Sequence, residues 1–341
     1  MDRNTQLVGQ SSSFLDAIER ASRAAPLDRP VLVAGERGTG KELVAERLHH
    51  LSSRWDGPLV VMNCAALPET LIEAELFGHE AGAFTGATKA RAGRFEEADG
   101  GTLFLDELAT LSSAAQDRLL RAVEYGEVTR IGASKPVTVD VRIVAATNED
   151  LPRLVAEGRF RADLLDRLSF EVVTLPPLRH RISDIMVLAD HFGRRMAMEL
   201  EWPDWPGFGA AATERLHSYE WPGNVRELRN VIERAVYRWE DGARPIELIQ
   251  FDPFESPWRP AASARTAEAG SSNVAPPHAS AASSAFDPQG CADLRLAVAE
   301  YEKAILAAAL ERCRWNQRAA AAALQLSYDQ LRHAMKRHRL G

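Results

Sequence analysis

The sequence predicts an α/β fold in which helices cover a parallel sheet, followed by smaller helical parts. Five short apolar runs between residues 31 and 175 alternate with helix-like stretches, which is the pattern of buried parallel strands joined by helical crossovers. The runs are Val31–Ala34, Leu59–Met62, Thr102–Leu105, Arg142–Ala145 and Phe170–Leu175. Ligands bind such sheets at the carboxyl ends of the strands, so polar motifs at those ends are candidates for a functional site.

Length and composition fit a multidomain globular protein. The chain has 341 residues, of which 45% are hydrophobic and 26% charged, which is more than one core usually serves. The start lacks the basic-then-apolar order of a signal peptide, and no apolar run approaches the ~20 residues of a membrane helix. We therefore expect a cytoplasmic protein without membrane insertion. The three cysteines, Cys64, Cys291 and Cys313, are odd in number and far apart in the sequence. This spacing predicts reduced thiols and neither a disulfide framework nor a zinc site.

Breaks in periodicity divide the chain further. After Pro176 the periodicity is helical, with interruptions at Trp202-Pro203, Pro206-Gly207 and Trp221–Gly223. Between Asp252 and Gly290, 25 of 39 residues are Pro, Ser, Ala or Gly, which is typical of a flexible linker. The predicted parts are an α/β subdomain at 7–175, a helical lid subdomain at 176–250, a linker at 251–290 and a small helical domain at 291–341.

Charge is distributed unevenly along the chain. The net charge is -7, yet six cations against one carboxylate give the segment from Cys313 to Gly341 a charge of +5. A protein that coats nucleic acid along its whole surface is therefore excluded, and any DNA contact is expected at the C-terminus.

A glycine-rich loop follows the first predicted strand and opens a helix, as a phosphate-binding loop does. Its backbone N–H groups and the helix N-terminus would face phosphates, and Lys41 would reach the terminal ones. Glu42 stands where a Ser or Thr would bind magnesium, although Thr39 is near. A merely flexible turn is the alternative. The candidate residues are Gly35, Glu36, Arg37, Gly38, Thr39, Gly40, Lys41 and Glu42.

Polar residues end two further strands. Asp106 and Glu107 follow a buried apolar run, where Asp106 could hold Mg²⁺ through water and Glu107 could polarise an attacking water as general base. Thr147 and Asn148 end another strand and could sense the terminal phosphate. The alternatives are a solvated strand end for the carboxylates and a simple turn for Thr147 and Asn148.

The stretch from Glu75 to Ala87 carries a specific resemblance. Its last six residues are Gly82, Ala83, Phe84, Thr85, Gly86 and Ala87, the GAFTGA loop of the AAA+ activators of sigma-54 RNA polymerase. The chain resembles this family from Leu7 to about Trp239, and is similar to Fis proteins from Tyr301 onward. The resemblance implies a sigma-54-dependent activator with an AAA+ ATPase domain, in which this loop contacts the sigma factor. Without it, a buried turn would be the preferred interpretation.

The resemblance also implies roles for four further residues. Asn63 matches the residue that restrains the catalytic glutamate, and Arg226 matches the sensor arginine of the lid. Arg161 and Arg167 match arginines that reach the ATP of a neighbouring subunit, which requires a ring and predicts a homo-hexamer. The alternative for either arginine alone is an ion pair on a helix surface.

The C-terminal segment has the layout of a helix-turn-helix that binds upstream DNA. An amphipathic helix is expected over Leu294–Arg312, with Leu294, Val298, Tyr301, Ile305, Ala308 and Leu310 available for a core or dimer face. A turn and a third helix from Tyr328 to Arg339 follow, and the second helix of such a motif enters the major groove. A basic dimerisation tail is the alternative. The predicted DNA-binding residues are Arg318, Ser327, Tyr328, Gln330, Arg332, His333, Lys336 and Arg337.

Within the family, the segments at Trp315–Arg318 and Leu326–Leu331 most resemble activators of the phage-shock operon. Because the ATPase resemblance begins at residue 7, we expect control in trans, and the resemblance names phage shock protein A as the inhibitor. Trp55 is a candidate anchor for it, with packing against the sheet edge as the alternative. Two other functions remain conceivable from the residues alone: an AAA+ machine with a different client, and a DNA-binding regulator that uses nucleotide only as a switch.

Overall fold

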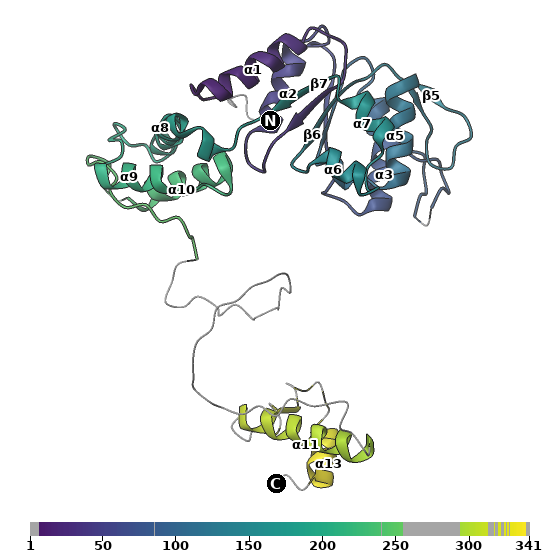
Figure 1. Ribbon diagram of the computed structural model, residues 1–341, viewed down its shortest axis with the longest axis vertical. Coiled ribbons are helices and arrows are strands. Elements are labelled where there is room, and N and C mark those ends of the chain that lie inside the picture. The colour runs from purple at the N-terminus through teal and green to yellow at the C-terminus, as the bar shows by residue number, and fades with distance from the viewer. Residues whose placement is uncertain are drawn as a thin grey trace. The chain divides into compact units, whose positions relative to one another are not determined.

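The computed structural model describes residues 7–84, 86–239, 241–254, 294–312 and 328–338, together with the separate positions 317, 320, 321, 324 and 326. The chain divides into two compact units, residues 1–260 and 261–341. Figure 1 labels their elements.

Unit 1 contains a five-stranded parallel sheet in the order β2-β3-β6-β1-β7. The strands are β1 (Val31–Ala34), β2 (Leu59–Asn63), β3 (Thr102–Asp106), β6 (Arg142–Thr147) and β7 (Glu171–Thr174). All five predicted strands are present, and three of them extend one or two residues further toward the polar motifs. A short antiparallel pair, β4 (Glu127–Val128) with β5 (Val137–Thr138), was not predicted, because two residues are too few to show a period.

Helices cover both faces of the sheet, as Figure 1 shows. Along β1 the side chains alternate between faces: Val31 and Val33 pack with the helices α1 (Ser12–Ala24) and α2 (Lys41–His50), whereas Leu32 belongs to the cluster on the other face. The helices of the α/β part are α1 (Ser12–Ala24), α2 (Lys41–His50), α3 (Glu69–Phe77), α4 (Arg94–Glu97), α5 (Ser113–Tyr125), α6 (Leu151–Ala156) and α7 (Ala162–Leu168). The predicted α/β fold with a helix-covered parallel sheet is confirmed.

The helical lid follows β7. It consists of the short η2 turn (Leu178–His180), α8 (Ile182–Glu199), α9 (Ala210–Ser218) and α10 (Asn224–Arg238). The helices stop at the predicted interruptions, and a separate core forms around the fully buried Trp221. Trp221 Nε1 donates to the Leu216 carbonyl at 2.9 Å, which satisfies the indole inside that core.

A buried ion pair joins the lid to the start of α1. Asp184 accepts from Arg181 Nε at 2.8 Å and from the backbone N–H groups of Gln10 and Ser11 at 2.6 and 2.8 Å. Arg181 lies over the Phe14 ring, 3.8 Å from its centroid. Because both charges are paired and hydrogen-bonded, their burial is tolerated, and the lid is anchored to the N-terminal segment that borders the site.

Unit 2 contains α11 (Leu294–Arg312) and α13 (Tyr328–His338), close to the predicted helices. Its core includes Leu306, Leu310, Leu331 and Met335. Ile305, expected on the core or dimer face, is 42% exposed, because the inward stripe of α11 runs through its neighbour Leu306 instead. The linker residues from 255 to 290 lie outside the described residues. None of the described helices is long and apolar enough to cross a membrane.

Candidate nucleotide site

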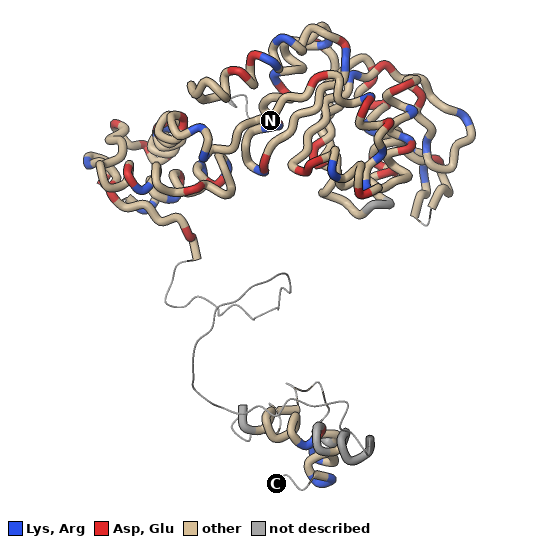
Figure 2. The backbone as a smooth tube through the Cα atoms, viewed as in Figure 1, with Lys and Arg blue, Asp and Glu red and all other residues tan. Residues whose placement is uncertain are grey.

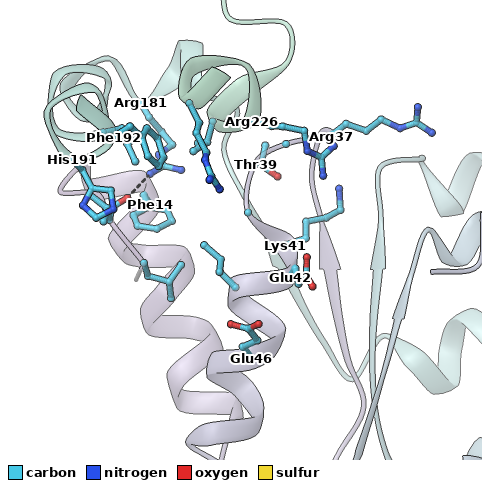
Figure 3. A pocket seen from close by; sticks show the side chains of 18 of the residues that line it. Phe14, Arg37, Thr39, Lys41, Glu42, Glu46, Arg181, His191, Phe192 and Arg226 are labelled. Atoms are coloured by element: carbon cyan, nitrogen blue, oxygen red, sulfur yellow. Dashed lines mark hydrogen bonds between the residues drawn. The ribbon is translucent and has the colours of Figure 1, made fainter. Parts of the chain in front are cut away.

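A cavity of about 480 Å³ lies where the glycine-rich loop, the end of β3 and the lid meet. Lys41, Asp106 and Arg226 line it from these three places. Figure 3 shows Thr39 and Lys41 beside Arg226, with Glu42 and Glu46 further along α2. A volume of this size fits a nucleotide, and its location is the strand edge that the sequence predicted.

The loop between β1 and α2 has the backbone of a phosphate cradle. Gly38 and Gly40 have φ angles of +77° and +100°, which favour glycine. Lys41 Nζ donates to the carbonyls of Gly35 and Glu36 at 2.9 and 3.1 Å. Burial lowers the pKa of Lys41 below its ordinary value. The two carbonyls hold the Lys41 ammonium against its own loop, where a phosphate oxygen could replace them as acceptor.

Thr39 and Glu42 differ in how they face the site. Thr39 is buried and its Oγ1 donates to the Glu36 carbonyl at 2.8 Å, so its oxygen keeps free lone pairs. Glu42 lies exposed in the first turn of α2, where a carboxylate is favoured by the helix dipole. Both residues line the cavity, and magnesium binding by Thr39 stays a prediction.

The lid clasps the glycine-rich loop through polar contacts that the sequence did not predict. Asn224 is fully buried, with its Nδ2 donating to Glu36 Oε2 (3.1 Å) and the Arg37 carbonyl (3.0 Å). Arg179 forms a two-pronged ion pair with Glu36, and these contacts lower the pKa of Glu36 to about 2. Positive φ angles at Trp221 and Asn224 mark the strained turn that aims this side chain.

Two carboxylates end β3, as predicted. Asp106 accepts from the Glu107 backbone N–H at 3.0 Å. Glu107 has φ +55°, an uncommon conformation for a residue other than glycine, and its carboxylate lies 3.3 Å from Arg37 Nε. With its amide nitrogen toward Glu107, as the surrounding donors and acceptors require, Asn148 donates to Glu107 Oε2 at 2.5 Å. The residues at the ends of β1, β3 and β6 therefore meet at one point.

Asn63 does not contact Glu107 in this arrangement. Its Nδ2 lies 3.5 Å from Asp106 Oδ2, and its Oδ1 accepts from the Ala65 backbone N–H at 2.8 Å. The predicted restraint of Glu107 by Asn63 is therefore not observed here, because that side chain is turned toward its own loop. Its role stays a prediction.

Arg161 and Arg167 lie outside the cavity of their own chain. Arg161 forms ion pairs with Asp117 and Asp163, and Arg167 pairs with Glu124 at 2.6 Å. The side chains of both arginines are at least 40% exposed. Within one chain they are therefore surface ion pairs, and their service to a neighbouring subunit stays a prediction.

The loop with the GAFTGA sequence is exposed. Phe84 is 39% exposed and packs edge-on against His79, with ring centroids 5.0 Å apart. The Gly82 N–H donates to the Ala87 carbonyl at 2.7 Å, which closes the base of the loop. Thr85 lies outside the described residues. The accessible loop favours a contact surface over the buried turn that the residues alone had suggested.

The exposed face of α13 carries the described candidates for DNA contact. Gln330, Arg332, His333, Lys336 and Arg337 are exposed, and basic residues mark this helix in Figure 2. Arg318 and Ser327 lie outside the described residues, as does the side chain of Tyr328.

Three family models cover most of the chain: the Sigma-54 interaction domain at residues 7–174, the AAA+ ATPase lid domain at 179–264 and the bacterial regulatory protein Fis family at 297–338.

Similarity to known proteins extends along the whole chain. It is 52% identical to the Psp operon transcriptional activator of Escherichia coli, over 98% of both chains. The chain belongs to the sigma-54-dependent AAA+ transcription activators. The regulatory protein ZraR of Salmonella typhimurium is 53% identical over 67% of this chain and 52% of its own length. The structure of NtrX from Brucella abortus in complex with ATP covers 98% of this chain and 69% of that one, with 31% identity and a TM-score of 0.67.

Membership confirms several predictions made from the sequence. The protein is an ATPase with an AAA+ domain, a helical lid and a C-terminal Fis-type helix-turn-helix, and it is a sigma-54-dependent activator. The alternatives of a different AAA+ client and of a nucleotide switch are thereby set aside. The predicted domain boundaries and the roles of individual residues stay predictions.

Proposed function

We propose that this activator works as a homo-hexameric ring that couples ATP hydrolysis to remodelling of sigma-54 RNA polymerase and promoter opening, and that it activates a phage-shock operon. The observation that carries the proposal is one unit holding both a nucleotide-sized cavity and an exposed GAFTGA loop. The similarity to the Psp operon transcriptional activator over nearly its whole length supports the phage-shock operon as the target.

The residues at the cavity divide the work of hydrolysis. Lys41 and the backbone N–H groups of the loop would bind the phosphates, and Arg226 would contact them from the lid. Glu107 would accept a proton from the attacking water, with Asn148 beside the terminal phosphate. The proximity of Lys41, Asp106 and Glu107 supports this division.

Magnesium fits the same edge. No group of three or more His, Cys, Asp or Glu residues is present in the described part of the chain. Mg²⁺ commonly uses one carboxylate together with substrate phosphates and water, so Asp106 alone, with the nearby Thr39 hydroxyl, is a sufficient donor set. When bound, the ion would neutralise charge on the phosphates.

Assembly would complete each site. Arg161 and Arg167 lie on or beside α7 with exposed guanidinium groups, so a neighbouring subunit's ATP could compete for them with the present carboxylates. Because each subunit would both offer and receive arginines, a closed ring follows. The exposed basic face of α13 would bind upstream DNA and concentrate the ring near the promoter.

Control by phage shock protein A would act on the surface of unit 1. Trp55 is 65% exposed, so packing against the sheet edge does not account for it, and exposed aromatic side chains often anchor interfaces. Trp55→Ala should escape inhibition of ATP turnover by the added inhibitor. Undiminished inhibition of the folded variant would remove Trp55 from this role.

The proposal is tested by open-complex formation in vitro. The full-length protein is combined with sigma-54 holoenzyme, ATP and a supercoiled promoter that carries its upstream site. We expect heparin-resistant complexes with ATP and none with ADP. Open complexes that form equally with ADP would contradict the coupling of hydrolysis to promoter opening.

A further inference from the structure

An ion pair joins the phosphate-binding loop to the residue proposed as general base. Arg37 Nε lies 3.3 Å from Glu107 Oε1. Arg37 comes from the loop after β1, and Glu107 follows β3, two strands away in the sheet. The contact is therefore a product of the fold and joins two separate parts of the site.

Asn148 closes this cluster. Its amide nitrogen donates to Glu107 Oε2 at 2.5 Å, and its oxygen accepts from Arg37 Nε at 3.3 Å. Both oxygens of the Glu107 carboxylate are thus engaged, one by a guanidinium and one by an amide. The two contacts direct the carboxylate at Arg37 and Asn148, so a water that is to be deprotonated would have to take the place of one of these partners.

The two ends of Arg37 are held differently. Its backbone carbonyl accepts from the buried Asn224 of the lid at 3.0 Å, and its neighbour Glu36 is paired with Arg179. Its side chain, however, is 67% exposed, so the guanidinium can turn without disturbing a core. The backbone of Arg37 is thus held by the lid, whereas its guanidinium group lines the cavity and can change partners.

The terminal phosphate of ATP would compete with Glu107 for the Arg37 guanidinium. It brings more negative charge than a carboxylate and offers the oxygen geometry that guanidinium groups bind in a two-pronged manner. We propose that Arg37 is a positioning residue: it holds Glu107, together with Asn148, in an unreactive arrangement until the terminal phosphate of ATP draws the guanidinium away. The proposal rests on Glu107 serving as the general base.

The test is a double-mutant cycle on nucleotide affinity in the full-length protein with Mg²⁺. The four proteins are wild type, Arg37→Ala, Glu107→Gln and the double variant, and the probes are the non-hydrolysable β,γ-imido analogue of ATP and ADP. Glu107→Gln frees the guanidinium in advance. It should tighten analogue binding about 3- to 5-fold more when Arg37 is present than when it is absent, the range of a partly exposed ion pair.

ADP distinguishes the terminal phosphate from general electrostatics. Because ADP lacks that phosphate, its affinity should show less than about twofold coupling between the two positions. Arg37→Lys should recover part of the coupling, since it keeps the charge but not the fork. Arg153→Ala, which removes an exposed arginine–glutamate pair from α6, is the matched control and should show no coupling with Glu107.

The decisive outcomes are separate from those of the proposed function. Equal effects of Glu107→Gln in both backgrounds, or equal coupling for the analogue and ADP, would overturn the proposal. A cycle that behaves as expected in a protein that opens no promoter would contradict the proposed function alone, since binding is read without turnover or polymerase.

Discussion

Two glycine-containing loops of unit 1 differ in what surrounds them. A Cβ atom at Gly38 of the phosphate-binding loop would lie 2.3 Å from the Gly223 carbonyl oxygen of the lid. At Gly82 and Gly86 of the GAFTGA loop, no atom of the described residues beyond the chain neighbours lies within 4 Å of such a Cβ. The phosphate-binding loop is packed against the lid at Gly38, whereas the GAFTGA loop has space around its two glycines and makes its ring contact through Phe84 with His79. Glycines therefore allow close packing against the lid in the phosphate-binding loop, and an accessible loop tip in the GAFTGA loop.

The largest effect on this comparison is expected from Lys41→Ala. The ammonium lies on the carbonyls of Gly35 and Glu36, and among the described residues no other lysine lines the cavity, so phosphate binding loses its central charge. Equilibrium binding of ATP should be abolished while unit 1 stays folded. ATP affinity within twofold of wild type would remove Lys41 from the phosphate site.

Glu107→Gln should separate binding from chemistry. The amide cannot accept the proton of the attacking water, so the activation free energy of hydrolysis should rise by about 2–4 kcal/mol. ATP should still bind. Steady-state hydrolysis and equilibrium binding on one preparation measure both effects. Turnover close to that of wild type would show that another group is the base.

Gly38→Ala and Gly82→Ala compare the two loops directly. Both positions have positive φ angles, so each alanine carries backbone strain of roughly 1–2 kcal/mol. Only at Gly38 does the methyl group also meet the lid. We expect at least a tenfold loss of ATP affinity for Gly38→Ala and less than a twofold change for Gly82→Ala. Similar affinities for the two variants would show that the lid contact does not fix the loop.

The smallest effect concerns acid stability. In the folded state the pKa of Glu36 is lowered from 4.5 to about 2, so its stabilisation is complete above the unfolded pKa and is lost as pH falls toward the folded value. Because this side chain is 41% exposed, less than about 1 kcal/mol is expected. Guanidinium unfolding at pH 6 and pH 3 should show a smaller loss of stability for Glu36→Gln than for wild type. Equal losses would contradict the pairing.

The sequence was sufficient for whatever depends on local patterns. The buried strands, the phosphate loop and the carboxylates after β3 follow from apolar runs and their polar ends, and α11 has the predicted bounds. Contacts across the sheet were not predictable in this way. Nothing local to Arg37 or Glu107 indicates that they pair, and the resemblance assigned the restraint of Glu107 to Asn63.

The lid clasp shows the same limit. Asn224 follows Pro222-Gly223, which is the sequence context of a simple turn residue, yet it is fully buried and donates to the loop. Its one sequence signal was the turn itself, which places a polar side chain at the start of α10. The partners of such a side chain come from distant segments, and the tertiary fold alone supplies them.

The proposed mechanism couples ATP hydrolysis at the phosphate-binding loop to the contact that the GAFTGA loop makes with the sigma factor. It is tested most directly by measuring ATP turnover and open-complex formation on the same preparation of Thr85→Ala, with wild type beside it. We expect turnover within about twofold of wild type, because none of the described residues of this loop lines the cavity, together with loss of open complexes. Normal promoter opening by Thr85→Ala, with sigma-54 holoenzyme and ATP, would contradict it.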